Sequence, residues 1–136
     1  MVERIGVSLE KDLLDQFDRL IAQQGYNNRS EAIRDLIRQL LVEKEWSEED
    51  HFNVASVVLV YDHHTLELSK RLTDFQHDHH ELIISTLHVH MDHDNCMEIL
   101  VLRGKTKEIT RFGQELISTR GVKLGKFIPA STGKNL

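Results

Sequence analysis

The feature that most constrains the fold is one short strand pattern followed directly by two amphipathic helix patterns. Residues 4–9 alternate apolar and polar side chains, which is the period of a half-buried strand. Residues 11–24 and 31–43 repeat apolar side chains at helical spacing, with Gly25 suited to end the first helix and Ser30 to N-cap the second. A lone strand forms no sheet, and a segment of about 40 residues rarely buries enough apolar surface to fold alone. The sequence therefore predicts a symmetric dimer with paired strands and interlocked helices.

The rest of the chain predicts a second unit with another order of elements. Residues 44–53 are charged and aperiodic, which predicts a linker. Strand and helix patterns then follow in the order βαββαβ, at residues 54–61, 65–78, 82–91, 96–103, 105–119 and 122–128. This is the order of the ferredoxin-like split βαβ arrangement. The predicted fold class is α+β, with domains at residues 1–43 and 54–131 and a tail at 132–136.

Net charge gives no direct support for nucleic-acid binding, because the formal value is -5. Residues 1–42 contain six Lys or Arg and seven Asp or Glu, so oligomerisation would have to gather positive groups on one face. No stretch approaches the roughly 20 apolar residues that span a bilayer, and the start shows no secretory signal. We therefore expect a cytoplasmic protein without a membrane partner.

Metal-ligand side chains cluster in one part of the chain. Six of the nine histidines lie between residues 77 and 93, and the only cysteine, Cys96, follows them. His88 and His90 share one face of a predicted strand, and a four-residue loop returns the chain so that Cys96 can lie beside them. Thiolate with imidazole suits Zn, Cu or Ni and disfavours Mg or Ca. A fourth ligand is expected from residues 76–80, which contain three histidines.

Two other interpretations of these residues carry less weight. Scattered surface histidines with a buried free cysteine would explain single residues, but not the same-face pair beside a cysteine. A catalytic site would make Cys96 a nucleophile with His88 or His90 as its base. Nothing in the sequence marks an oxyanion hole or a phosphate loop, and a closed four-ligand site leaves no position for a substrate. We therefore expect no enzymatic activity.

The strand at residues 4–9 is also a candidate DNA reader. In a paired ribbon, one face would cover the helices and the other would present Arg4, Gly6 and Ser8 twice. A two-stranded ribbon fits the major groove of B-DNA, where arginine is the most frequent base reader. Arg29 and the free N–H groups at the Ser30 helix start could hold phosphate. The alternative is that the ribbon serves dimerisation alone.

Several motifs in this order resemble the NikR family of nickel-responsive repressors. The ribbon-helix-helix half is matched by Arg4-Ile-Gly-Val-Ser-Leu and by Gly25-Tyr-Asn-Asn-Arg-Ser-Glu-Ala-Ile-Arg-Asp. The metal strands of that family are matched by Leu87-His-Val-His-Met-Asp and by Asn95-Cys-Met-Glu. The resemblance extends from Arg4 to about Ser131.

The resemblance implies a ribbon-helix-helix dimer joined to ACT-like domains that form a homotetrameric core, a dimer of dimers. It implies one square-planar Ni(II) per subunit, bound between subunits by His88, His90 and Cys96 of one chain and His77 of its neighbour. Nickel-loaded protein would then bind a palindromic operator and repress nickel-uptake genes.

The resemblance also assigns residues in the N-terminal half. The DNA-reading positions of the family map onto Arg4, Gly6 and Ser8. Gly6 departs from the Thr or Ser usual in the family, and glycine has no side chain to read a base. Glu31 and Asp35 match acidic positions that hold a secondary cation near the DNA.

Two further functions remain open at this point. A nickel or copper storage or delivery protein would use the same ligands without specific DNA binding, but it has no need of a ribbon-helix-helix segment. An ACT-type amino-acid-responsive regulator would keep the DNA-binding element, but its pocket has no need of the His-x-His-x5-Cys set.

Overall fold

The computed structural model describes residues 1–136, apart from the side chain of Leu66. Helical spacing also predicts that Leu66 faces the core, and this prediction lies outside the described side chains. Backbone contacts divide the chain into two compact units, residues 1–40 and residues 41–136.

The first unit contains helix α1 (Lys11–Gln23) and the start of helix α2 (Arg29–Ser47). α1 ends as predicted before Gly25, whose φ of 87° is a left-handed conformation that glycine adopts without a steric penalty. Within the described chain, residues 1–10 form no strand, and Ile5 and Val7 are exposed. A strand needs a hydrogen-bonding neighbour, and a single copy of this chain provides none for this segment.

The start and end of α2 differ from the sequence prediction. The side chain of Asn28 accepts a hydrogen bond from the Glu31 N–H at 2.9 Å, so Asn28 caps the helix. The prediction that Ser30 is the N-cap is therefore wrong, since Ser30 already lies in the first turn. α2 also continues past the predicted end at residue 43, because Trp46 packs against the second unit and its Nε1–H donates to the Ala130 carbonyl at 2.7 Å.

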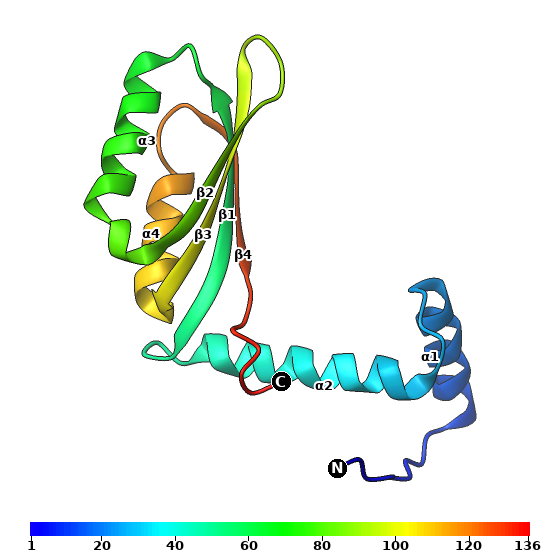
Figure 1. The fold of residues 1–136 in the computed structure, drawn as a ribbon. Helices are drawn as coiled ribbons and strands as arrows, with labels where there is room; N and C mark the ends of the chain where they lie inside the picture. The colour runs from blue at the N-terminus through cyan, green and yellow to red at the C-terminus, as the bar shows by residue number, and fades with distance from the viewer. The chain divides into compact units, whose positions relative to one another are not determined.

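The second unit is a four-stranded antiparallel sheet with two helices, as predicted (Figure 1). Its elements are β1 (Phe52–Asp62), α3 (Leu66–Asp78), a 3-10 turn (His80–Leu82), β2 (Ile83–His90), β3 (Asn95–Lys105), α4 (Thr106–Ile117) and β4 (Val122–Pro129). The spatial order β2-β3-β1-β4 is that of the ferredoxin-like arrangement. The hairpin of β2 and β3 brings the two predicted metal-ligand segments side by side.

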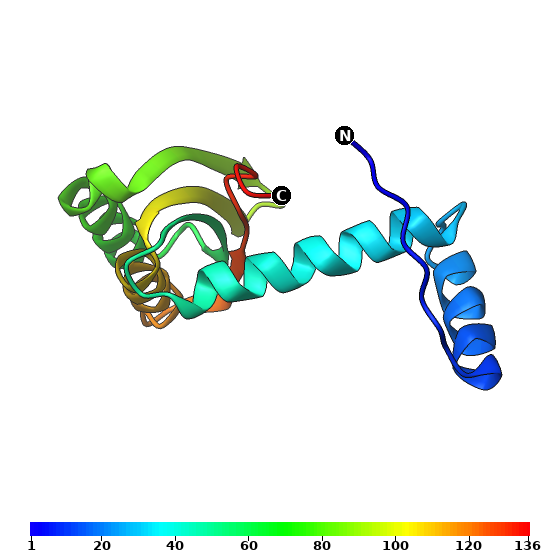
Figure 2. The same cartoon turned by 90° about the horizontal axis from the view of Figure 1, so that it is seen from below.

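Both helices cover the same face of the sheet, and the core lies between the two layers (Figures 1 and 2). Alternate residues of β1 are buried on this face, and Phe112 and Leu116 of α4 lie against them. α4 lies so close to the sheet that a Cβ added at Gly113 would stand 2.5 Å from the Phe127 ring. No described helix combines the length and apolarity needed to cross a membrane.

Candidate metal centre

The hairpin register places the predicted ligands on one face of the sheet. His90 lies directly opposite Cys96, and His88 lies opposite Glu98. Residues directly opposite each other in an antiparallel pair point to the same side. That side is the helix-covered face, because Cys96 and Glu98 are buried there. The register thus confirms that both histidines share a face with the cysteine.

Glu98 links three elements behind this face. Its carboxylate accepts a hydrogen bond from the Tyr61 hydroxyl of β1 at 2.9 Å and from the Gln76 amide of α3 at 2.8 Å. Burial, together with the neighbouring Glu98 carboxylate, raises the pKa of Tyr61. Tyr61 therefore remains a neutral donor, and the network fixes α3 against β3 beside the candidate ligands.

Cys96 is fully buried, and its thiol donates to the Tyr61 carbonyl at 3.5 Å. Burial raises the pKa of this thiol, and the carboxylates of Glu98 and Asp62 act in the same direction. A thiolate at this position therefore needs a compensating positive charge. A bound divalent cation provides that charge and displaces the proton, so the residue fits a metal ligand.

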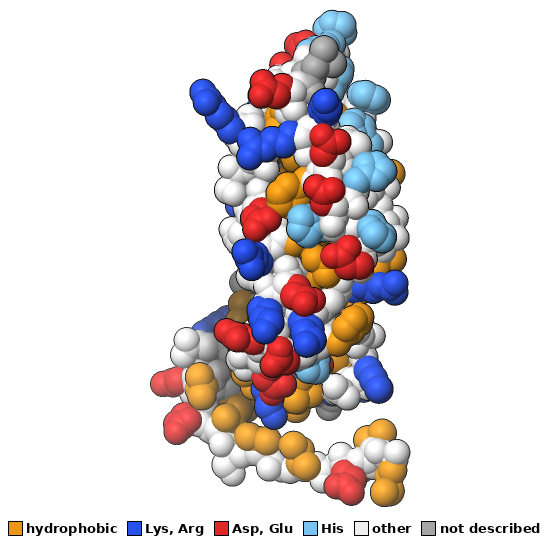
Figure 3. Space-filling view, turned by 90° about the vertical axis from the view of Figure 1, so that its left-hand side faces the viewer, with side chains coloured by type: hydrophobic (Ala, Val, Ile, Leu, Met, Phe, Trp, Pro, Cys, Tyr) orange, Lys and Arg blue, Asp and Glu red, His pale blue; other side chains and the backbone are white. Residues whose placement is uncertain are grey.

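Sequence reasoning missed two histidines that lie near these residues. His63 and His64 follow β1 directly, and the His63 ring lies 5.1 Å from the His90 ring and 4.3 Å from the His64 ring. The His90 ring in turn lies 5.2 Å from that of His88. The signal was available, because the end of β1 must adjoin the start of β3 in the predicted fold. Figure 3 shows histidines gathered along one side of the second unit.

His77 does not join the other three predicted ligands within one chain. It is exposed near the end of α3, in a groove with Thr73, Gln76, His80, Ile83 and Thr86. Among the described residues, no three of His77, His88, His90 and Cys96 bring their ligand atoms within 4.8 Å of one another. The β2 strand has no neighbour on its outer edge, and its residues 84–90 are exposed. This edge is open to another copy of the chain.

The predicted DNA-contacting residues lie in exposed parts of the first unit. Arg4, Gly6 and Ser8 lie in the extended segment before α1. The Arg29 guanidinium instead pairs with the Asp18 carboxylate of α1 through two hydrogen bonds of 2.8 Å. The hydrogen bond from Arg29 lowers the pKa of Asp18.

The predicted secondary-cation residues occupy successive turns of α2. Glu31 lies in the first turn and is exposed. Asp35 accepts a hydrogen bond from the Tyr26 hydroxyl at 2.8 Å and pairs with Arg38 at 3.2 Å. Asp35 therefore has protein partners within the single chain.

Comparison with known proteins covers nearly the whole chain. The family described as "NikR C terminal nickel binding domain" matches residues 54–129, and "Ribbon-helix-helix protein, copG family" matches residues 3–44. A relative from Anaeromyxobacter dehalogenans is 54% identical over 138 residues, covering 100% of this chain and 99% of that protein. A second, from Caldanaerobacter subterraneus, is 52% identical over 135 residues, covering 99% and 88%. Both relatives are ascribed a role as nickel-responsive regulators.

A solved structure supports the fold of the second unit. An uncharacterized protein from Thermotoga maritima superposes with a TM-score of 0.52 at 16% identity, covering 59% of this chain and 99% of that one. At this identity the likeness concerns the fold alone.

Proposed function

Because this chain belongs to the NikR family of nickel-responsive regulators, we propose that it is a nickel-dependent transcriptional repressor. Ni(II) binding to the second unit promotes binding of the first unit to a palindromic operator, and the regulated genes are those of nickel uptake. The observation that carries the proposal is the hairpin register, which sets a buried cysteine opposite a histidine and beside another.

The proposed nickel site consists of His88, His90 and Cys96 of one chain and His77 of a second chain, with one Ni(II) per subunit. Three imidazole nitrogens and a thiolate suit Ni(II) or Cu(II) in a square-planar arrangement, whereas zinc would favour a tetrahedral one. The exposed position of His77 supports a ligand donated to a neighbour. The buried, protonated Cys96 supports a site whose thiolate forms only with metal.

The proposed assembly is a homotetramer, a dimer of dimers. The sheet face opposite the helices carries exposed apolar side chains that a second copy would cover: Leu87, Val89, Val101, Leu124 and Ile128. In the first unit, exposed Ile5 and Val7 would be covered once two copies pair their residues 4–9 as a ribbon.

The proposed ribbon places Arg4 and Ser8 in the major groove, with Gly6 between them allowing close approach of the backbone to DNA. Arg29 and the N–H groups near Ser30, at the start of α2, hold phosphate. Arg29 then exchanges or shares its partner Asp18 with a phosphate group. Glu31 and Asp35 hold a secondary cation that strengthens the DNA-bound form.

The test is a DNA-binding titration with palindromic sequences from promoters of nickel-uptake genes, using metal-free protein and protein with one nickel per chain. Specific binding with nickel alone is expected, together with a thiolate-to-nickel charge-transfer band. Cys96→Ala should lose the band and the nickel-dependent binding. Arg4→Ala should weaken binding at least roughly tenfold and leave nickel affinity unchanged.

Arg19→Ala is the matched control for Arg4→Ala, because Arg19 is an exposed arginine outside the proposed ribbon. Stoichiometric nickel binding without any specific DNA complex would overturn the repressor proposal and favour nickel storage. Retained specific binding by Arg4→Ala would reject the ribbon as the reader.

A further inference from the structure

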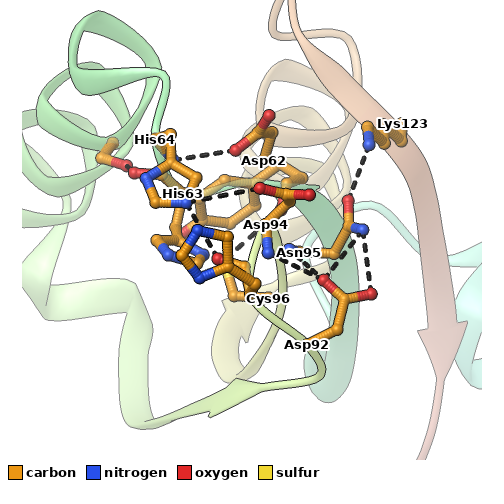
Figure 4. A network of polar contacts seen from close by, with 11 residues as sticks. Asp62, His63, His64, Asp92, Asp94, Asn95, Cys96 and Lys123 are labelled. Carbon is orange, nitrogen blue, oxygen red and sulfur yellow. Dashed lines mark hydrogen bonds and ion pairs between the residues drawn. The ribbon is translucent and has the colours of Figure 1, made fainter.

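Two loops that are distant in sequence meet beside the candidate nickel ligands. The turn after β1 carries His63 and His64, and the loop between β2 and β3 carries His93 and Asp94. They meet because Asp62 lies opposite Asn95 in the pairing of β1 with β3. The His63 N–H donates to the Asp94 carbonyl at 3.0 Å, which fixes one loop against the other (Figure 4).

Three side chains from these loops converge at one exposed point. The ligand atoms of His64, His93 and Asp94 all lie within 4.8 Å of one another. The His64 Nε2 lies 3.5 Å from the Asp94 carboxylate and 2.8 Å from the His93 carbonyl oxygen, and the two imidazole rings are 5.1 Å apart. Within the described part of the chain, no other three histidine, cysteine or carboxylate side chains are grouped this closely.

The backbone that carries His93 and Asp94 is held in place by its own contacts. The Asp92 carboxylate accepts hydrogen bonds from the N–H groups of Asp94 and Asn95, each at 2.8 Å, and these lower the pKa of Asp92 to about 2. The Asn95 side chain accepts a hydrogen bond from Lys123 of β4 at 2.6 Å. On the other loop, the His64 N–H donates to the Asp62 carboxylate at 2.9 Å. Binding of an ion would thus require small side-chain adjustments rather than ordering of a loop.

We propose that His64, His93 and Asp94 form a second, open binding site for a divalent transition-metal ion, with water completing the coordination. Two imidazoles and a carboxylate suit Ni(II), Cu(II) or Zn(II), and the imidazoles disfavour Ca(II). The ion takes the place of the proton that His64 Nε2 now shares with the His93 carbonyl. The site has no ligand in common with the proposed His77, His88, His90 and Cys96 set and no thiolate, so it binds more weakly.

The second site adjoins the first through the chain and through ring contacts. His93 and Asp94 lie in the loop between His90 and Cys96, and His63 lies between the rings of His64 and His90. An ion at the second site would therefore tie the β1–α3 turn to the loop that holds two ligands of the first site.

The experiment is a calorimetric titration of the full-length protein with nickel chloride in a buffer that does not bind metal, with the thiolate charge-transfer band recorded in parallel. The wild type should bind two nickel ions per chain, one tightly and one more weakly. His64→Ala and His93→Ala should each weaken the second event at least roughly tenfold and leave the band unchanged. Cys96→Ala should lose the band and keep the weaker event.

The matched control is His51→Gln, a histidine at the opposite end of β1 that should leave both binding events unchanged. Circular dichroism and Trp46 fluorescence verify that each variant is folded. Binding of a single nickel per chain by the wild type would overturn the proposal, as would a second event that survives in both His64→Ala and His93→Ala. The Cys96→Ala result tests the first site separately, so failure of one site is distinguishable from failure of the other.

Discussion

The two units of this chain differ in how much of their apolar surface they bury within one copy. In residues 41–136, the faces of β1, β3 and α4 that meet are fully buried. In residues 1–40, Ile21 and Ala32 are the only buried apolar residues among the described side chains, and most of the others remain exposed: Leu13, Leu20, Leu36, Ile37 and Leu40. The second unit therefore has a core of its own, whereas the first needs a partner to complete one.

The largest effect is expected from a change in the core of the second unit. Leu100 is fully buried, so Leu100→Ala should lower the free energy of unfolding by about 2–5 kcal/mol. Urea denaturation followed by the fluorescence of Trp46, the only tryptophan, reports on this unit. Val101→Ala is the control, because Val101 is its neighbour on the opposite face of β3 and is 37% exposed. Equal losses for the two variants would contradict the described core.

A smaller effect, dependent on protein concentration, is expected in the first unit. Leu36 is 49% exposed in the single chain, so Leu36→Ala should cost little unless a partner covers it. In the proposed dimer the loss should reach about 1–3 kcal/mol. Amide exchange of α1, measured over a range of protein concentrations, should show protection that rises with concentration and falls in this variant. Gln39→Ala, an exposed change in the same helix, is the control.

Protection of α1 that is independent of concentration and unaffected by Leu36→Ala would remove the proposed distinction between the units. The first unit would then be stable as a monomer despite its exposed side chains.

The smallest effect concerns the ion pair that joins the two helices of the first unit. The pKa of Asp18 is lowered by Arg29, so the pair stabilises the fold above the ordinary pKa of an aspartate, about 4, and this contribution is lost as the pH falls below it. Asp18→Asn should slightly reduce the amide protection of α1 at pH 7 and have no effect near pH 3. Asp12→Asn serves as the control, since Asp12 is an exposed aspartate of the same helix. An Asp18→Asn effect that persists at low pH would show that the ion pair is not its cause.

The same contrast explains how much the sequence could predict. The βαββαβ order and the position of Cys96 opposite the histidines were predictable, because alternating burial within one chain sets the strands and their register. The helix start at Asn28 was not predicted, since Asn28 and Ser30 are both good N-caps and spacing does not distinguish them. The meeting of His64 with His93 and Asp94 depends on tertiary contact between two loops, which periodicity does not encode.

The complete burial of Cys96 has a consequence for how the protein can be studied. Its sulfur is out of reach of a thiol-modifying reagent while the sheet is closed. Labelling can therefore proceed only during transient opening of the native state, and its rate measures the free energy of that opening. Since the chain has no other cysteine, a mass increase after brief exposure to reagent comes from this one position. Each molecule thus carries a built-in stopwatch for the breathing of its own sheet.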